Sequence, residues 1–337
     1  MLTGWHPIHL KQSFSRALVT FSIGPLKASI SAKSGAPAVA AAGEPDGGFG
    51  RNLIFILKTA RPGFWLTSVW FYLLPIAQQQ VFASPRFWVG LIFVTFPFGL
   101  LIYGWNDIMD AEVDRFNARK DTFLFGARGT AQELQWLPWI ILLAQLPWAA
   151  VFISLEGPQM VAWYAALVLA TAVYNLPGIG FKNFPVLDML NQLGYLLVFW
   201  LSSRLNHVPQ LAWPAFVFGG LFAIHSHLLG QIMDATVDKQ AGRKTTALTV
   251  GIVPAKCLLM LFLAVEAGLV FYFFGDRMVA AFLLAGMAWF SLDAFFVFRE
   301  RAYPLWFTRG ILLGWNGMAI GSAWWVWSRG TFSHVRT

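Results

Sequence analysis

The sequence predicts an all-α protein that crosses a membrane several times, and three observations support this fold class. First, apolar runs recur after residue 60, each close to the roughly 20 residues that a helix needs to cross a bilayer. Second, only 12% of the 337 residues are charged, against roughly 25% in soluble domains, and the mean hydropathy is +0.59. Third, Lys and Arg residues fall mostly between the apolar runs and favour alternate loops.

The first 50 residues differ in composition from the rest of the chain. They are rich in Ser, Ala and Gly, they contain no acid before Glu44, and they carry the basic residues Lys11, Arg16, Lys27 and Lys33. A basic, Ser-rich and acid-free leader resembles an organellar transit peptide. A disordered cytosolic tail explains the same composition. Both interpretations stay open at this point.

The segment SGAPAVAAAGEPDGG reads as a flexible linker and marks a domain boundary. We therefore expect a tail or transit peptide over residues 1–50, a transmembrane domain over 51–330 and a short C-terminal tail over 331–337.

Nine apolar runs follow the linker, and each is a candidate transmembrane helix, because an open chain in lipid satisfies its backbone only as a helix. The runs cover residues 64–83, 87–109, 134–154, 160–176, 186–203, 212–236, 254–274, 278–298 and 305–328.

The positions of the basic residues predict how such a bundle is oriented. The loops after the second, fourth, sixth and eighth runs hold ten Lys and Arg residues, whereas the opposite loops hold three, Arg86, Arg204 and Arg277. By the positive-inside rule, the basic loops face the cytoplasm, or the matrix or stroma of an organelle. The net charge of +8 therefore reports membrane topology. No basic patch with interleaved aromatic residues suggests a nucleic-acid partner, and the single Cys257 excludes an intrachain disulfide and a multi-cysteine metal site.

Acidic residues are concentrated at the ends of the second and sixth runs, both on the predicted basic side. In the stretch YGWNDIMDAEVDRFNARKD, Asp107, Asp110 and Asp114 are spaced i, i+3, i+7, which places them on one face of a helix, with Asn106 at its edge. The stretch GQIMDATVDKQAGRK repeats the spacing with Gln231, Asp234 and Asp238. Acids at such positions are costly in a membrane and are usually functional.

If the second helix packs against the sixth, five aspartates face one cavity, and they cannot all stay ionised there without a cation. Hard oxygen ligands without a His or Cys cluster select Mg²⁺, which binds through one or two carboxylates together with substrate phosphates. We therefore expect Mg²⁺ to be held by Asn106, Asp107, Asp110, Asp114, Asp234 and Asp238, where it would clamp a diphosphate.

Basic residues follow both acidic motifs and can pair with phosphate oxygens. They are Arg119 and Lys120 after the first motif, Arg243 and Lys244 after the second, and Lys182, the only charge in its loop. Each could instead set membrane topology or anchor a lipid headgroup.

The motif NDIMDAEVD resembles the NDxxDxxxD motif of the UbiA superfamily of intramembrane prenyltransferases. Three further stretches are similar to that family in the same order: DATVDKQAGRKTTALTVG, RPGFW from Arg61, and YNLPGIGFK from Tyr174 to Lys182. The resemblance implies a nine-helix fold with a lateral opening to lipid, Mg²⁺-dependent ionisation of a prenyl diphosphate, and substrate contacts at Arg61 and Tyr174. Gln231 departs from the family pattern, where many members carry a third acid, which leaves the number of metal ions on that side open.

Polar residues inside two apolar runs are further candidates for the cavity wall. His227 continues the stripe of Gln231, Asp234 and Asp238 and could accept a proton, although a structural hydrogen bond between helices explains it as well. Asn191 lies in a polar stripe of the fifth run and could orient an acceptor, or could simply join two helices.

We expect a membrane prenyltransferase that ionises a polyprenyl diphosphate and transfers the prenyl group to an apolar acceptor, aromatic or isoprenoid, that enters from the bilayer. A terpene cyclase with the same fold would use the same site without an acceptor. A transporter or an inactive structural protein is the alternative from another class, but it would not need to keep five aspartates.

Overall fold

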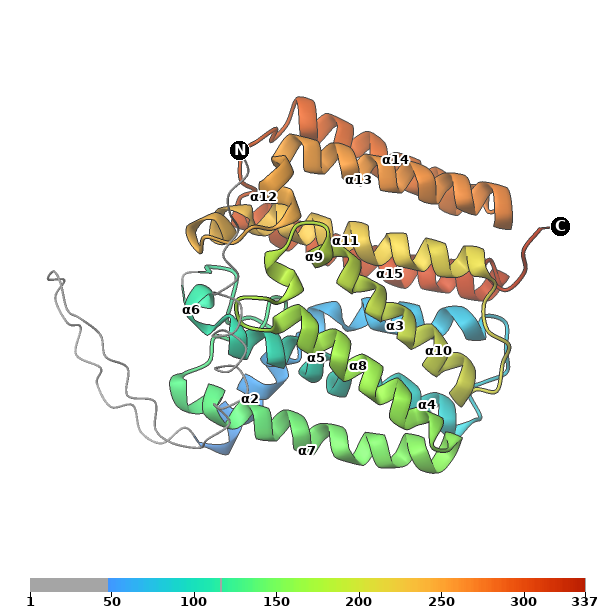
Figure 1. Cartoon of the computed structure of the whole chain (residues 1–337). Helices are drawn as coiled ribbons and strands as arrows, with labels where there is room; N and C mark the ends of the chain where they lie inside the picture. Colours follow the sequence, from blue (N-terminus) through green and yellow to red (C-terminus); the bar gives the residue numbers. More distant parts are fainter. Residues whose placement is uncertain (1–47, 116, 337) are drawn as a thin grey trace, which may run out of the picture. The chain divides into compact units, whose positions relative to one another are not determined.

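The computed structural model describes residues 48–115 and 117–336, and within these ranges the chain is helical almost throughout (Figure 1). The one extended pairing among the described residues is an isolated bridge between Thr122 and Gly126. The predicted all-α fold class is confirmed. The predicted tail or transit peptide lies outside the described residues, apart from its last three positions.

The helices follow one another along the chain with short connections, and several are divided by brief 3-10 or π turns. The bounds are α2 Phe49–Thr59, η1 Pro62–Phe64, α3 Trp65–Leu73, η2 Leu74–Ile76, α4 Pro85–Phe93, α5 Phe96–Met109, α6 Ala111–Asp114, α7 Ala131–Glu156, α8 Gln159–Asn175, η3 Phe181–Asn183, α9 Leu187–Leu190, η4 Asn191–Tyr195, α10 Leu196–Leu205, α11 Trp213–Gln240, α12 Thr246–Val250, α13 Ile252–Leu269, η5 Val270–Phe274, α14 Arg277–Phe295 and α15 Leu305–Arg329.

Among the described residues, five helical segments are long and apolar enough to span a membrane. They are Pro85–Met109, Ala131–Glu156, Trp213–Gln240, Ile252–Phe274 and Arg277–Phe295. The other predicted runs are helical as well, but two of them are divided, the first where Pro75 turns the chain into η2 and the fifth where η4 precedes α10. Nine crossings therefore stay a prediction, whereas a polytopic membrane protein is confirmed.

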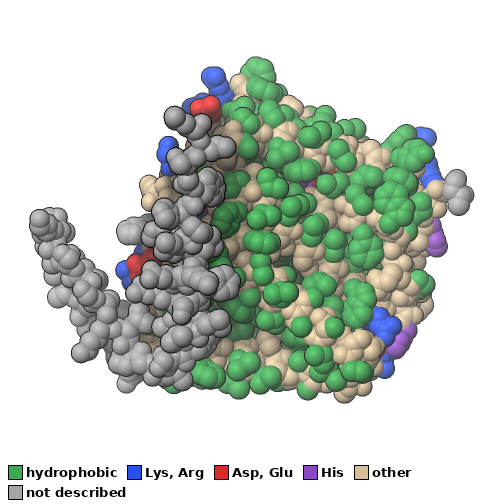
Figure 2. All heavy atoms as spheres, viewed as in Figure 1, with side chains coloured by type: hydrophobic (Ala, Val, Ile, Leu, Met, Phe, Trp, Pro, Cys, Tyr) green, Lys and Arg blue, Asp and Glu red, His purple; other side chains and the backbone are tan. Residues whose placement is uncertain are grey.

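The surface of the bundle fits this environment. Figure 2 shows hydrophobic side chains over most of the face that it draws, and charged side chains near its two ends. Large apolar side chains such as Leu143 on α7, Tyr272 on η5 and Trp324 on α15 are mostly exposed. A lipid-facing surface needs such residues, since no backbone or charged group can be left in hydrocarbon without a partner.

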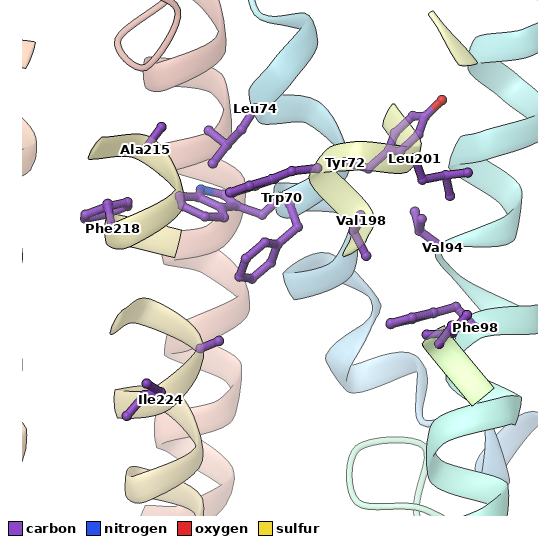
Figure 3. Close-up of a cluster of buried hydrophobic side chains, with 14 of the residues drawn as sticks. Trp70, Tyr72, Leu74, Val94, Phe98, Val198, Leu201, Ala215, Phe218 and Ile224 are labelled. Atoms are coloured by element: carbon purple, nitrogen blue, oxygen red, sulfur yellow. The ribbon is translucent and has the colours of Figure 1, made fainter. Parts of the chain in front are cut away.

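Aromatic side chains fill the interior where α3, α10 and α11 meet (Figure 3). The Trp70 ring stacks on Phe222 with 4.7 Å between ring centroids, and Phe71 lies 5.1 Å from Phe199. Small residues allow this close approach, because a Cβ on Gly219 would lie 2.7 Å from the Phe199 ring. Since lipid tails are as apolar as these side chains, dispersion in close packing holds the helices together.

The order of the helices brings the ends of α5 and α11 to the same end of the bundle, where Figure 1 shows α6 and α12. Helix α5 packs against α2, α7 and α8, and α11 packs against α9, η4, α12 and α13. The chain after each of the two helices then folds back over that end. Both acidic motifs lie there.

Candidate active site

The two acidic motifs line one cavity at this end of the bundle. The main cavity, of about 270 Å³, is lined by Asn106 and Asp110 from the first motif and by Asp234 and Asp238 from the second. A smaller acid pocket, of about 80 Å³, shares these four residues and adds Asp114. The sequence thus identifies residues from opposite halves of the chain that the fold brings together.

Asp107 is separated from the other aspartates, although its spacing predicts a common helical face. Helix α5 ends at Met109, and Asp110 lies outside helical geometry with φ −102° and ψ 8°. Asp107 lines neither the main cavity nor the acid pocket. Its carboxylate is buried, and one oxygen accepts from Arg61 Nη2 and from Lys120 Nζ, each at 2.6 Å.

Arg61 reaches Asp107 from a strained backbone position. Its φ of 48° is in the left-handed region, and its guanidinium lies 4.6 Å from the centroid of the Tyr103 ring. Gly126 leaves room for this side chain, since a Cβ there would lie 2.8 Å from Arg61 Nε. Burial lowers the pKa of Arg61, but Asp107 and Asp114 outweigh it and hold that pKa above its usual value.

Asp110 is the most heavily paired acid of the main cavity. Lys182 Nζ donates to it at 2.6 Å, and Arg243 forms a second ion pair with the same oxygen. Burial raises the pKa of Asp110, but Arg243 and Lys182 more than compensate, so the pKa lies below its usual value. The carboxylate is therefore ionised at neutral pH.

Arg243 also joins the two motifs directly, because its other nitrogen, Nη1, lies 3.3 Å from Asp238 Oδ1. Arg119 pairs with Asp234 in the same cavity, and its guanidinium lies 4.9 Å from the centroid of Phe125. Burial, with a further effect from nearby Arg61, lowers the pKa of Arg119 to about 10, which still leaves it cationic at neutral pH. Each acid of the main cavity thus has a basic partner, and those of Asp110 and Asp234 come from distant parts of the sequence.

Two predicted phosphate-binding residues take other positions. Lys120 is buried between Asp107 and Asp114, with Nζ 2.7 Å from the Asp114 carboxylate, and it lines only the acid pocket. Lys244 is exposed and lines neither cavity. Arg243 and Lys244 are neighbours in the sequence, yet only Arg243 points into the site.

Gln231 lines the main cavity and also organises its wall. Its Nε2 donates to Asp188 at 2.8 Å, and its Oε1 accepts from Ala247 N at 3.0 Å. Asp188 also accepts from the backbone N–H and the hydroxyl of Thr246, at 2.7 and 2.5 Å. These bonds tie α9, α11 and α12 together. The sequence places Asp188 in the polar stripe of the fifth run, but it does not predict the partners Gln231 and Thr246, which lie 43 and 58 residues further along the chain.

A side cavity of about 150 Å³ adjoins the main one and is mostly apolar, with Phe98, Ile102 and Leu167 in its lining and Asn191 at its polar part. Tyr103, Asn106, Tyr174, Gln192, Tyr195 and His227 line both cavities. Two hydrogen bonds hold this shared wall: Tyr103 to Tyr195 at 3.1 Å between hydroxyls, and Tyr174 Oη to His227 Nε2 at 3.4 Å.

Aromatic side chains cover the apolar part of the main cavity. Phe64, Phe71, Tyr103, Tyr195 and Trp315 line it. Trp65, by contrast, donates to the Ala60 carbonyl, and Tyr72 donates to the Phe87 carbonyl inside the bundle. These two side chains stabilise the fold and do not face the cavity.

The donor set of the main cavity fits Mg²⁺ completed by a substrate. Three carboxylates and the Asn106 amide offer oxygen ligands, and Mg²⁺ characteristically uses one or two carboxylates plus phosphate oxygens. Among the described residues, no three His, Cys, Asp or Glu side chains are grouped closely enough to hold a metal alone. Basic side chains lie between the acids of the main cavity and pair with them. A diphosphate would attract the same basic side chains.

Comparisons with known proteins identify relatives by sequence. The chain is 30% identical over 211 residues to the lycopene elongase/hydratase of Halobacterium salinarum, covering 58% of this chain and 71% of that relative. It is 26% identical over 199 residues to the lycopene elongase/hydratase of Corynebacterium glutamicum, covering 58% of this chain and 69% of that relative. No family model matches the chain.

A solved structure has a similar fold. The structure of a UbiA homolog from Archaeoglobus fulgidus bound to GPP and Mg²⁺ superimposes with a TM-score of 0.59 at 17% identity, over 81% of this chain and 99% of that one.

Proposed function

This chain belongs to the UbiA superfamily of intramembrane prenyltransferases, and we propose that it ionises a prenyl diphosphate with Mg²⁺ and transfers the prenyl group to an isoprenoid acceptor. The observation that carries this proposal is the convergence of Asp110, Asp234 and Asp238 on one cavity, interleaved with Arg119, Lys182 and Arg243. A site that contains both acidic and basic side chains suits a diphosphate that binds together with Mg²⁺, because the acids can hold the metal and the bases can hold phosphate oxygens.

Asn106, Asp110, Asp234 and Asp238 would hold Mg²⁺, which, when bound, would neutralise the diphosphate and stabilise it as a leaving group. Arg119, Lys182 and Arg243 now pair with the aspartates, so they already lie where phosphate oxygens would be bound. As the bond to the prenyl carbon breaks, negative charge grows on the diphosphate, and these fixed cations stabilise that charge.

The prenyl chain would occupy the aromatic part of the main cavity. An allylic cation forms there when diphosphate leaves, and it must be kept from water until the acceptor attacks. The faces of Tyr103 and Trp315 can each stabilise a nearby cation by about 0.5–2 kcal/mol. Tyr103 lines both cavities and is therefore a candidate for this role.

The acceptor would approach from the side cavity, because the shared wall contains the polar groups that could act on it. Asn191 and Gln192 would orient the acceptor, and His227 or Tyr174 would take up the proton that is lost after bond formation. The two relatives are named lycopene elongase/hydratases. A long polyene is therefore the acceptor class that we propose.

Product analysis by mass spectrometry tests this function. Membranes containing the full chain would be incubated with Mg²⁺, a panel of prenyl diphosphates and lycopene, with EDTA and donor-only reactions as controls. A product that combines the donor and the acceptor, and that is lost with EDTA, is expected. A cyclic hydrocarbon from the donor alone would indicate a terpene cyclase, and no consumption of any donor would refute the proposal.

A further inference from the structure

A second charged site lies at the end of the bundle opposite the aspartates. Helix α13 runs away from the acidic end, and η5 leads to Asp276 at the start of α14, close to the end of α15 (Figure 1). Here an open cavity of about 570 Å³ is lined by Arg277, Arg329, His334 and Arg336, and we call it the far-end basic pocket. It shares no residue with the cavities described above.

The acid in this pocket does not neutralise its arginines. Asp276 is the one carboxylate in the lining, and it accepts hydrogen bonds from Trp325 Nε1 at 3.0 Å and from Thr331 Oγ1 at 2.7 Å. Two backbone N–H groups, those of Met278 and Val279, also donate to it. Within the described part of the chain, none of the partners of Asp276 is a basic side chain, so Asp276 forms no ion pair with the arginines of the pocket.

The arginines are held in place by neutral contacts and remain exposed. The Arg329 guanidinium lies 3.8 Å from the centroid of the Trp325 ring, and Arg336 Nη2 donates to the Gly275 carbonyl at 3.3 Å. Gly275 permits this approach, because a Cβ there would overlap the Arg336 side chain. Arg277 and His334 form no ion pair in the part of the chain that is described.

A second basic cluster at this end has a structural role, because its side chains surround a buried acid. Arg86, Arg204 and His207 surround Glu156, whose side chain is only 3% exposed, and Arg86 pairs with it directly. That cluster has a buried counter-ion, and it joins the end of α7 to the start of α4 and to the end of α10 with the turn that follows it. Among the described residues, the far-end basic pocket has no buried acid that pairs with its arginines. Its basic residues are also an exception to the concentration of Lys and Arg at the acidic end.

The surroundings of the pocket identify the kind of anion that it fits. Met278, which lines the pocket, is 61% exposed, and the adjoining Tyr272 and Trp324 are 74% and 68% exposed. A phosphate in the pocket would thus lie beside an apolar surface that faces lipid. Clusters of arginine at a membrane surface attract anionic lipid headgroups.

We propose that the far-end basic pocket binds the phosphate of an anionic lipid headgroup, with Arg277 and Arg336 as its main contacts. The acyl chains would lie along α14 and α15. The bound lipid would add a further link between η5, α14 and the segment after α15, which hydrogen bonds from Thr331 and Arg336 already join. This proposal does not depend on the proposed catalytic function.

Native mass spectrometry of the full chain, purified in neutral detergent, tests the proposal. Phosphatidylglycerol would be titrated in one arm, phosphatidylcholine in the second and inorganic phosphate in the third. The wild type is expected to bind one phosphatidylglycerol much more tightly than phosphatidylcholine. R277Q/R336Q is expected to weaken that binding by about tenfold or more, since it removes two of the charges.

The matched control is R301Q/R309Q, which removes the same charge from exposed positions outside the pocket. It is expected to bind phosphatidylglycerol as the wild type does. Equal binding by R277Q/R336Q and by the control would overturn the proposal. Binding of inorganic phosphate with the affinity of the lipid would also overturn it, in favour of a soluble anion. If R277Q/R336Q does not fold, R277Q alone provides the test, because Arg277 makes no contact that the fold needs.

Discussion

Asp110 follows the end of α5 and Asp238 lies on α11, 128 positions further along the sequence, yet the two carboxylates share one guanidinium, that of Arg243. Arg243 thus joins the two acidic stretches directly in the wall of the main cavity. Of the two basic residues that follow the second acidic stretch, Arg243 and Lys244, we therefore expect only Arg243 to act on the substrate.

Replacing Arg243 should impair substrate binding, whereas replacing its neighbour should not. Arg243→Gln removes a cation from the site, and we expect kcat/KM for the prenyl diphosphate to fall by about 100-fold. Lys244→Gln removes an exposed charge and should change kcat/KM by less than about twofold. Steady-state kinetics on both variants checks this prediction. Equal losses of kcat/KM in the two variants would contradict the assignment of Arg243, but not Lys244, to the site.

Gln231→Glu should destabilise the protein and should not create a better metal site. The substitution removes the donor that faces Asp188 and places a second carboxylate against it, with a cost of about 1–3 kcal/mol. The melting temperature in detergent should fall relative to the wild type. Gln210→Glu, which adds the same charge at an exposed position, is the control and should leave the melting temperature unchanged. A rise in melting temperature or in Mg²⁺ affinity for Gln231→Glu would contradict the structural role.

The buried ion pair between Lys256 and Asp293 should be costly to break and less costly to replace. The two atoms are 2.8 Å apart, both side chains are fully buried, and Lys256 also donates to the Arg299 carbonyl. Lys256→Met alone leaves a buried carboxylate without its cation and should reduce the free energy of unfolding by about 3–5 kcal/mol. Lys256→Met combined with Asp293→Leu should lose less than the single variant. Unfolding in a denaturing detergent measures both, and additive losses would argue against a coupled pair.

Stability should decrease in acid partly through Asp276. Burial alone would raise the pKa of Asp276, but hydrogen bonds from Thr331, Val279, Trp325 and Met278 hold it below its usual value. A carboxyl with a lowered folded-state pKa stabilises the protein above its unfolded value of about 3.9, and that contribution is lost as pH falls through the folded-state pKa. The melting temperature of the wild type should therefore fall more steeply below about pH 4 than that of Asp276→Asn. Parallel curves for the two proteins would exclude this contribution.

The sequence predicts the fold class and the two acidic stretches, because both depend on local patterns. Apolar length identifies membrane helices, and aspartates at a helix end are conspicuous in a chain with few acids. The spacing also predicts that Asp107 and Asp110 face the same cavity, but in the structure only Asp110 lines it. Helix α5 ends between them, and Arg61 and Lys120 hold Asp107 away from the cavity.

The partners of the site residues could not be predicted from local patterns, because they come from distant parts of the sequence. The contacts of Asp110 with Lys182 and of Gln231 with Asp188 join segments that are 72 and 43 residues apart. Only the packing of α8, α9 and α11 decides which of several polar residues meet. The aromatic lining is a similar case, since Phe64 and Trp315 reach the cavity from the two ends of the described chain, whereas Trp65 does not.

The rate of diphosphate release from a prenyl diphosphate in the presence of Mg²⁺ decides whether both acidic stretches act on one substrate. It should be measured for the wild type, Asp110→Asn and Asp234→Asn, with intact folding confirmed by size-exclusion chromatography. We expect each substitution alone to reduce the rate by about 100-fold or more, because the diphosphate would be bound from both sides of the cavity. A wild-type rate in either variant would contradict a shared site.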